Sequence, residues 1–322
     1  MNPLRVFTWH IHGSYLYYLT QTPVEFYLPK GEGEGYGGRS GTFPWGDNVH
    51  EIPIDEVKNH EFDVILFQHR KNYLEDQYQI LTEAQRALPK IYLEHDPPQE
   101  HPTNTKHFVD DPDMLLVHVT HFNKLMWDNN RTPATVIEHG VMVPDHVTYS
   151  GELDKGIVVV NNLGKRGRRL GLDVFEQVQE HVPLDLMGMG SAEVPGTGVR
   201  GEVSPHEIAE FVSHYRFFFN PIRYTSLGLA ICEAMMAGLP IVGLATTELV
   251  TVVENGKTGY LATNPEELVA HMQRLLDDPR HAHELSQNAR AYAEKRFGIE
   301  RFAEDWKRTL TQFVQERKET RG

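Results

Sequence analysis

The chain has 322 residues, of which 40% are hydrophobic and 24% charged, and its formal net charge is −14. This composition is typical of a globular protein that is long enough for two domains of ordinary size. The negative charge argues against general binding to nucleic acid, because such binding depends on neutralising phosphates. It also argues against broad attraction to anionic lipid, although a local basic patch would leave peripheral membrane association open.

The sequence contains few features that would indicate membrane insertion, secretion or disulfide formation. No apolar run approaches the roughly 20 residues that span a bilayer, and the first residues, MNPLRVFTWH, lack the plan of a signal peptide. Cys232 is the only cysteine. A single thiol cannot form an internal disulfide, so we expect a cytoplasmic protein in which this residue packs and does not act as a nucleophile.

The first half of the chain alternates short apolar runs with helical patterns. Continuous apolar runs are typical of parallel strands that are covered on both faces, and strands alternating with helices predict an α/β domain. The expected strands are 4–9, 24–28, 64–68, 91–93, 114–119 and 134–139, and the expected helices are 14–19, 72–87 and 122–127.

Polar residues follow the first expected strand, where His10 and His12 precede Gly13. Ligands bind at the carboxyl ends of strands in open α/β sheets. We therefore favour pocket lining for the two histidines over a general-base or metal-ligand role, and hydrogen bonding within the loop stays open as the alternative.

The segment 30–46 is rich in glycine and contains a formal G-x-G-x-x-G at 33–38. A dinucleotide fingerprint must open a helix, and the residues that follow are poor helix formers. We expect instead a mobile lid or ligand-contacting loop, with Arg39 available for contacts, and a plain flexible connection stays open as the alternative.

The expected strand 91–93 runs into Glu94 and His95, and the segment that follows is dense in His, Asp and Glu. Such density suggests a metal site, but the spacing fits no short ligand pattern. We therefore expect no metal.

A polar stretch at 144–155 is the expected linker, and the second half restarts with a strand at 157–160. Basic residues crowd the segment after that strand, in an otherwise acidic protein. Arginine forks suit phosphate oxygens, so this position favours phosphate binding over a solvated surface. The candidates are Arg166 and Arg169, which we prefer, with Arg168 and the preceding Asn162. Further helices are expected at 172–180, 265–276, 280–296 and 299–316, and a strand at 184–188.

The stretch 220–261 predicts a loop after an apolar strand, then a helix rich in small residues, then the strand 241–244. The N-terminus of this helix offers free N–H groups and the positive end of a dipole, which both suit a phosphate. The residues at that end are Ser226, Leu227, Gly228 and Leu229.

This stretch resembles the donor-sugar signature of the retaining glycosyltransferases of family 4, also called group 1. Glu233, within CEAMMAGLP, matches the second Glu of the signature, and the segment VENGKTG at 253–259 matches the turn that follows. Gly13 and His95 fall where family members carry a Gly and a His at strand ends. The first Glu of the signature is replaced by Thr225, and Ser226-Leu227-Gly228 replaces the usual Pro-Phe-Gly.

The resemblance implies the GT-B fold, in which two Rossmann-like α/β domains face across a cleft. Residues 1–147 would form the acceptor-side domain, with the last helix, about 300–318, packing back on it, and 156–299 would bind the nucleotide-sugar. The implied reaction is transfer of a sugar from a nucleotide-diphosphate sugar to an acceptor, with retention of anomeric configuration and without a metal or cofactor. The acceptor would be a glycan, a lipid-linked molecule or a small molecule.

The resemblance also implies residue roles. Glu233 would accept hydrogen bonds from the ribose hydroxyls, and the basic residues and helix N-terminus would hold the diphosphate. His95 and Thr225 would contact the transferred sugar, and His10, His12, Gly13 and Arg39 would lie on the acceptor side. Because the absent Glu normally contacts that sugar, a non-catalytic nucleotide-sugar-binding protein stays open, as does another GT-B enzyme such as a nucleotide-sugar epimerase. The sequence determines neither the donor, the acceptor nor the oligomeric state.

Overall fold

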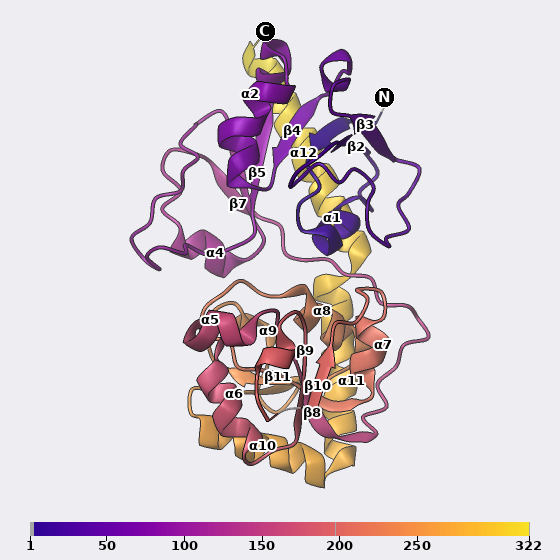
Figure 1. Cartoon of the computed structure of the whole chain (residues 1–322), viewed down its shortest axis with the longest axis vertical. Coiled ribbons are helices and arrows are strands. Elements are labelled where there is room, and N and C mark those ends of the chain that lie inside the picture. The colour runs from indigo at the N-terminus through magenta and orange to yellow at the C-terminus, as the bar shows by residue number, and fades with distance from the viewer. Residues whose placement is uncertain (1–2, 197, 322) are drawn as a thin grey trace. The chain divides into compact units, whose positions relative to one another are not determined.

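The structure is a computed structural model that describes residues 3–196 and 198–321 (Figure 1). The chain divides into two compact units, one that runs to Gly140 and resumes at Ile299, and one that comprises Val141–Gly298. The first unit thus ends before the predicted boundary at residue 147. None of the helices in these described ranges combines the length and the hydropathy that crossing a bilayer requires.

A seven-stranded parallel sheet forms the centre of the first unit, in the order β3-β2-β1-β4-β5-β6-β7. The strands are β1 Arg5–Thr8, β2 Glu25–Lys30, β3 Val49–Pro53, β4 Val64–Phe67, β5 Lys90–Glu94, β6 Leu115–His118 and β7 Ala134–Val136. The helical elements are α1 Gly13–Leu19, η1 Val57–Asn59, η2 Asn72–Asp76, α2 Gln77–Ile80, α3 Glu83–Arg86, α4 His121–Met126 and α12 Ile299–Arg321.

The sequence does not predict the edge strand β3. Only Val49 and Ile52 are buried among its five residues, VHEIP. Two apolar side chains are too few to indicate a strand, and β3 forms because β2 offers a free edge to which it pairs over its whole length.

The single helix expected at 72–87 is wrong, because the segment breaks at Leu81, which is extended and buried. The helix restarts at Thr82 through a capping box. The Thr82 hydroxyl accepts the Gln85 backbone N–H at 3.1 Å, and the Gln85 side chain accepts the Thr82 N–H at 2.9 Å. These two reciprocal bonds satisfy N–H groups that the first turn of α3 would otherwise leave unpaired.

The second unit is built on a six-stranded parallel sheet in the order β10-β9-β8-β11-β12-β13. The strands are β8 Leu153–Val159, β9 Leu184–Met187, β10 Gly198–Gly201, β11 Tyr215–Asn220, β12 Ile241–Leu244 and β13 Gly259–Ala262. The helical elements are α5 Leu163–Leu170, α6 Leu172–Gln179, η3 Ser191–Glu193, α7 Ile208–Ser213, α8 Leu229–Ala237, α9 Leu249–Val252, α10 Pro265–Asp277 and α11 Pro279–Phe297.

The aromatic strand β11 fills the core of this unit, and all six of its residues are buried. Phe217 pairs in register with Gly156 of β8. A Cβ atom at residue 156 would lie 2.2 Å from Cε2 of Phe217, so only glycine leaves room for this ring.

The last helix, α12, packs on the first unit, where it appears in yellow beside the sheet (Figure 1). The buried indole N–H of Trp306 donates to the Tyr15 hydroxyl at 3.3 Å. Phe302 lies so close to Gly140 that a Cβ there would be 2.2 Å from the Phe302 Cβ. The chain therefore closes the first unit with a segment that follows the whole second unit in sequence.

Gly171 offers a test of the connection between α5 and α6. Its φ is +84°, and a Cβ would lie 1.9 Å from the backbone oxygen of Pro221. We expect Gly171→Ala to lower the free energy of unfolding by about 3 kcal/mol or more, because left-handed strain adds to a clash with backbone that cannot rotate away. Urea denaturation measures this loss.

Gly256→Ala is the control, since its φ is +75° and no described atom lies within 4 Å of the added carbon. It should lose only about 1–2 kcal/mol, the left-handed strain alone. Equal losses for the two variants would contradict the close approach of Pro221.

Candidate functional site

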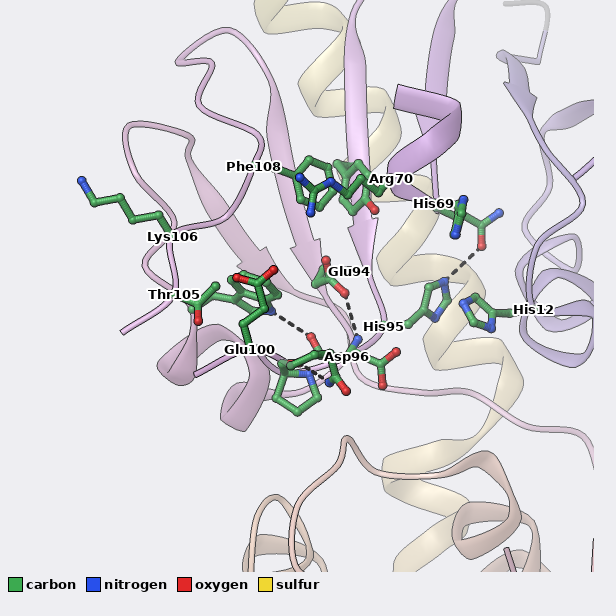
Figure 2. Close-up of a pocket in the computed structure, with 15 residues that line it drawn as sticks. His12, His69, Arg70, Glu94, His95, Asp96, Glu100, Thr105, Lys106 and Phe108 are labelled. Carbon is green, nitrogen blue, oxygen red and sulfur yellow. Dashed lines mark hydrogen bonds between the residues drawn. The ribbon is translucent and has the colours of Figure 1, made fainter. Parts of the chain in front are cut away.

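A pocket of about 420 Å³ opens in the first unit, after the carboxyl ends of β4 and β5 (Figure 2). His12, Gln68, His95 and Asp96 line it together with the indole of Trp127. Side chains that follow neighbouring parallel strands meet at the same edge of the sheet, where ligands bind in open α/β folds. The structure therefore brings His12 and His95, both candidates from the sequence, into one pocket.

The contacts of His95 fix its tautomer. The Gln68 amide nitrogen donates to the Thr8 hydroxyl at 3.1 Å, which leaves the Gln68 Oε1 as an acceptor for Nε2 of His95 at 3.2 Å. Nε2 of His95 therefore carries the proton, and Nδ1 holds a lone pair. Burial lowers the pKa of His95 well below its ordinary value, and the neighbouring His12 and His139 lower it further. His95 is a neutral imidazole at pH 7.

His12 lies beside His95, with ring centroids 4.2 Å apart. Its backbone is left-handed, with φ 52°, at the start of α1. Packing of the ring against the protein lowers the pKa of His12, while the carboxylates of Asp96 and Glu94 raise it. The first unit thus presents two adjacent imidazoles at one side of the pocket.

His10 lies outside this pocket. Its Nδ1 hydrogen-bonds the backbone oxygen of Gly38 at 2.7 Å. Its ring packs edge-on against the Trp45 ring, with the ring centroids 5.6 Å apart. A Cβ at Gly13 would lie 3.3 Å from the His10 Nε2. His10 and Gly13 thus support the glycine-rich segment and do not line the cavity.

The glycine-rich segment is tied to the sheet and is not a free lid. The His10 N–H donates to the oxygen of Gly35 at 3.0 Å, and the Gly38 N–H donates to Pro29 at 3.1 Å. The Arg39 N–H donates to Glu51 at 2.8 Å, while the Arg39 side chain lies exposed. These bonds give the segment a defined position next to β1 and β2.

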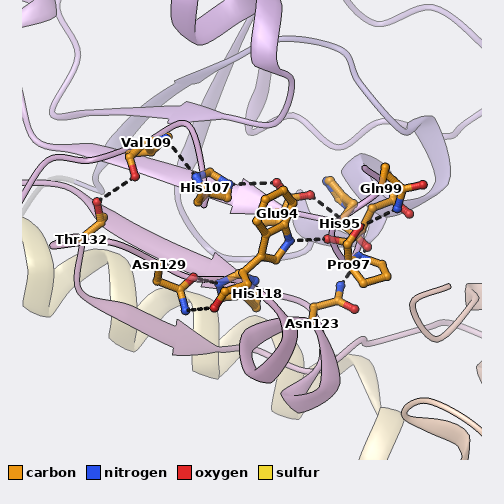
Figure 3. A network of polar contacts seen from close by, with 12 residues as sticks. Glu94, His95, Pro97, Gln99, His107, Val109, His118, Asn123, Asn129 and Thr132 are labelled. Atoms are coloured by element: carbon orange, nitrogen blue, oxygen red, sulfur yellow. Dashed lines mark hydrogen bonds and ion pairs between the residues drawn. The ribbon is translucent and has the colours of Figure 1, made fainter. Parts of the chain in front are cut away.

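A buried network lies behind the pocket (Figure 3). Nδ1 of His107 accepts the Val109 N–H at 3.0 Å, so the proton of this ring is on Nε2, which donates to Glu94 at 3.0 Å. The other Glu94 oxygen accepts the Asp96 N–H at 3.0 Å. His107 is therefore a structural residue. No group of three or more His, Cys, Asp or Glu side chains in the described ranges is arranged to hold a metal ion.

The same network fixes the backbone that carries His95 and Asp96. The Trp127 indole donates to the Asp96 oxygen at 2.8 Å, and the Asn123 amide donates to the His95 oxygen at 3.1 Å. With the bond from Asp96 N–H to Glu94, the two peptides of this turn are held by side chains from α4, its C-cap and β5.

The basic segment of the second unit is a helix and not a loop. It forms α5, with Asn162 left-handed at its start and a kink at Gly167. The Arg168 guanidinium pairs with the Asp173 carboxylate, to which Arg223 also binds. The guanidinium of Arg169 lies over the Tyr224 ring at 5.8 Å and donates through Nε to the Tyr224 oxygen at 3.2 Å.

These contacts join α5 to the loop that precedes α8. The backbone N–H groups of Arg223 and Tyr224 donate to the Arg169 oxygen at 3.1 and 3.2 Å. The sequence indicates neither Arg223 nor Asp173, because an ion pair between residues this far apart leaves no local pattern. The structure therefore brings the basic segment next to the candidate residues that follow β11.

The candidates after β11 differ in exposure. Thr225 and Ser226 are half-buried, Leu227 is buried, and Gly228 is exposed at the start of α8 with no atom within 4 Å of an added Cβ. Glu233 lies on α8 with 4% of its surface exposed. The start of this helix therefore has open space around its backbone.

Residues 154–278, which contain this second set, match the family model described as glycosyl transferases group 1. Among solved structures, sucrose-phosphate synthase from Thermosynechococcus elongatus superposes with a TM-score of 0.70 at 16% identity, over 98% of this chain and 100% of that one. The Anabaena protein Alr3699/HepE, in complex with UDP and glucose, superposes with a TM-score of 0.72 at 14% identity, over 96% of this chain and 100% of that one. The fold is that of the GT-B glycosyltransferases.

Two curated relatives align over part of the chain. Sulfoquinovosyl transferase SQD2 of Arabidopsis thaliana is 27% identical over 163 residues, which is 45% of this chain and 31% of the relative. Sucrose synthase of Denitrovibrio acetiphilus is 30% identical over 139 residues, 41% of this chain and 17% of the relative. The alignments thus span less than a third of either relative's length.

His118, at the end of β6, makes the stability of the first unit depend on pH. Its Nε2 bonds the Asn129 side-chain oxygen at 2.7 Å, and burial lowers its pKa from 6.5 to about 4. The unfolded chain therefore binds a proton here at a higher pH than the folded chain does. The stability contribution of neutral His118 is complete above pH 6.5 and is lost as the pH falls from 6.5 towards 4.

We expect the wild-type protein to lose about 2 kcal/mol more than His118→Gln when the pH is lowered from about 7 to about 5. Glutamine keeps a donor for Asn129 but does not titrate. Denaturant unfolding of both proteins at both pH values measures the difference. Parallel losses would show that His118 titrates in the folded chain much as it does in the unfolded chain.

Proposed function

We propose that this chain transfers a sugar from a nucleotide-diphosphate sugar to an acceptor, with retention of anomeric configuration. The observation that carries the proposal is the segment after β11, which resembles the group 1 signature. Buried Glu233 lies on α8 there, and the loop before α8 is bonded to the basic helix α5. The GT-B fold of both units supports it. The Anabaena neighbour is described in complex with UDP and glucose, which agrees with a donor of this class.

In this proposal Glu233 accepts hydrogen bonds from the ribose hydroxyls of the nucleotide. A carboxylate offers two oxygens to a pair of neighbouring hydroxyls. Burial excludes water from such bonds and strengthens them, and the helix that carries Glu233 starts at a backbone open to a phosphate.

The diphosphate is held by the basic side chains of α5, with Arg166 as the preferred ligand, and by the N-terminus of α8. The cluster Lys165, Arg166, Arg168, Arg169 and Arg223 carries more positive charge than the Asp173 carboxylate neutralises. Positive charge fixed near the leaving diphosphate stabilises the charge that develops there in the transition state. No metal or cofactor is required by this scheme.

A neutral His95 suits a role in contact with substrate. Its Nδ1 lone pair can accept a hydrogen bond from a sugar hydroxyl, while Gln68 holds the opposite nitrogen. In the retaining enzymes that this chain resembles, the leaving phosphate is thought to take the proton of the acceptor, so the proposal assigns no side chain as general base.

The replacement at Thr225 favours one alternative, a protein that binds a nucleotide-sugar without transferring it. Assay of transfer and hydrolysis over a panel of nucleotide-sugars separates the two. Binding of a nucleotide-sugar with no turnover for any of them supports the alternative.

Glu233→Gln should weaken the binding of nucleoside diphosphates by about 1–3 kcal/mol, the usual cost of losing a charged hydrogen-bond acceptor. Isothermal titration calorimetry over a panel of nucleoside diphosphates measures the change. Glu294→Gln makes the same chemical change on the exposed face of α11, where the carboxylate pairs with Arg290 at 3.0 Å, and should leave affinity unaltered. Equal affinities of the two variants would reject the role of Glu233.

Thr225→Val removes a hydroxyl and keeps the shape of the side chain. We expect turnover to fall about tenfold, the cost of one hydrogen bond of about 1.4 kcal/mol made in the transition state, while affinity for the bare nucleotide stays the same. Thr225→Ser keeps the hydroxyl and should keep most of the turnover. If valine and serine behave alike, the hydroxyl does not contact the sugar.

A further inference from the structure

The pocket of the first unit contains a carboxylate that makes no hydrogen bond or ion pair with any other described residue. In the described part of the chain, the Asp96 side chain accepts no hydrogen bond and pairs with no cation, and only the backbone of this residue is bonded. Glu100, also on the pocket wall, has no hydrogen bond or ion pair there either. Figure 2 shows Asp96 near His95 and Glu100 near Thr105 among the residues that line the pocket.

Asp96 is also held firmly in place. Its N–H donates to Glu94 at 3.0 Å, and its carbonyl oxygen accepts the Trp127 indole N–H at 2.8 Å. Glu94 is fixed in turn by the buried ring of His107 at 3.0 Å. Glu94, Trp127 and His107 thus fix the backbone of a residue whose carboxylate oxygens are left for a ligand, and a fixed backbone of this kind is typical of a binding residue.

The charge of the lining constrains that ligand. Glu94, Asp96 and Glu100 face the cations Arg70 and Lys106, so carboxylates outnumber cations. An anionic ligand would meet net repulsion, whereas hydroxyl groups would find several acceptors.

The apolar part of the lining is aromatic. It consists of Tyr92, Phe108, Trp127 and Pro97. No Leu, Ile, Val or Met side chain of the described residues contributes to the wall, so an alkyl chain would find little aliphatic surface to pack against. Flat aromatic faces suit the C–H groups of a ring that carries hydroxyls on its edge.

We propose that this pocket binds the acceptor as an uncharged, hydroxyl-rich molecule of the sugar class, with Asp96 as the carboxylate that accepts its hydroxyl hydrogen bonds. That the bound molecule is an acceptor rests on the proposed transferase function. That it is an uncharged saccharide rests on the lining of the pocket alone. It selects a saccharide over a lipid or a phosphorylated molecule as the acceptor.

One cation in the pocket lining allows an experiment to distinguish a neutral ligand from an anionic one. The Arg70 guanidinium lies over the Phe108 ring at 5.2 Å and makes no ion pair in the described ranges. An anionic ligand would use this cation, and it would bind more tightly once the charge of Asp96 was removed. A neutral saccharide would bind less tightly. The sign of the change on Asp96→Asn therefore distinguishes the two classes.

The experiment is saturation-transfer NMR titration of the full chain with D-glucose, D-fructose, maltose and glucose 6-phosphate. We expect at least one neutral saccharide to bind, and Asp96→Asn to raise its Kd by about 10–100-fold, as for loss of a charged acceptor. Glu100→Gln, an exposed residue whose change spares the fold, should raise it by about threefold. Asp55→Asn is the control, because Asp55 is exposed and lies outside the pocket lining.

An unchanged Kd in both pocket variants, no binding of any neutral saccharide, or tighter binding of glucose 6-phosphate by Asp96→Asn would overturn the proposal. The affinity for nucleoside diphosphates is measured on the same samples and reports on the second unit. Absence of saccharide binding together with normal nucleotide binding would therefore refute the proposed role of this pocket and leave the proposed transferase function untouched. Saccharide binding that depends on Asp96, in a chain that transfers no sugar, supports the pocket and refutes the transferase.

Discussion

The hydrogen bond from His107 to Glu94 is the interaction on which the candidate site of the first unit depends. The Val109 N–H donates to Nδ1 of His107, so the ring can only donate through Nε2, and a Glu94 oxygen accepts this hydrogen bond at 3.0 Å. A neutral donor avoids burying a second full charge, which would carry a large desolvation cost. The fixed carboxylate then accepts the Asp96 N–H and holds the backbone from which the Asp96 side chain extends.

The sequence predicts most of the parallel strands because buried strands consist of continuous apolar runs, such as VILF in β4. It fails where tertiary pairing or local bonding decides the structure. The edge strand β3 has only two buried apolar residues. The break at Leu81 follows from a capping box formed by two side chains, Thr82 and Gln85. The apolar spacing of 72–87 continues through this break and does not reveal it.

The candidate site was predictable to the extent that strand ends mark it. His95 follows β5, and its position alone indicates a ligand-facing residue. The density of acidic and His residues around it suggests a metal, yet His107 serves the network of Glu94. The sequence does not indicate Asp96 as a binding residue. Its candidacy depends on a backbone that is hydrogen-bonded within the fold and a carboxylate that is not. No spacing in a sequence encodes that difference.

The second unit shows why a basic run is harder to interpret than a buried carboxylate. Arg168 binds Asp173, and Arg169 holds Tyr224 through its side chain and the peptides of Arg223 and Tyr224 through its backbone oxygen. Thr225 follows directly on this anchored segment. Neutralising Arg168 or Arg169 would therefore release the loop before α8 as well as remove charge. A loss of nucleotide affinity in such a variant would not identify a phosphate ligand, because displacement of the loop predicts the same loss. Glu233 sits within the helix and is separated from these anchors, so its substitution gives the cleaner reading of the nucleotide site.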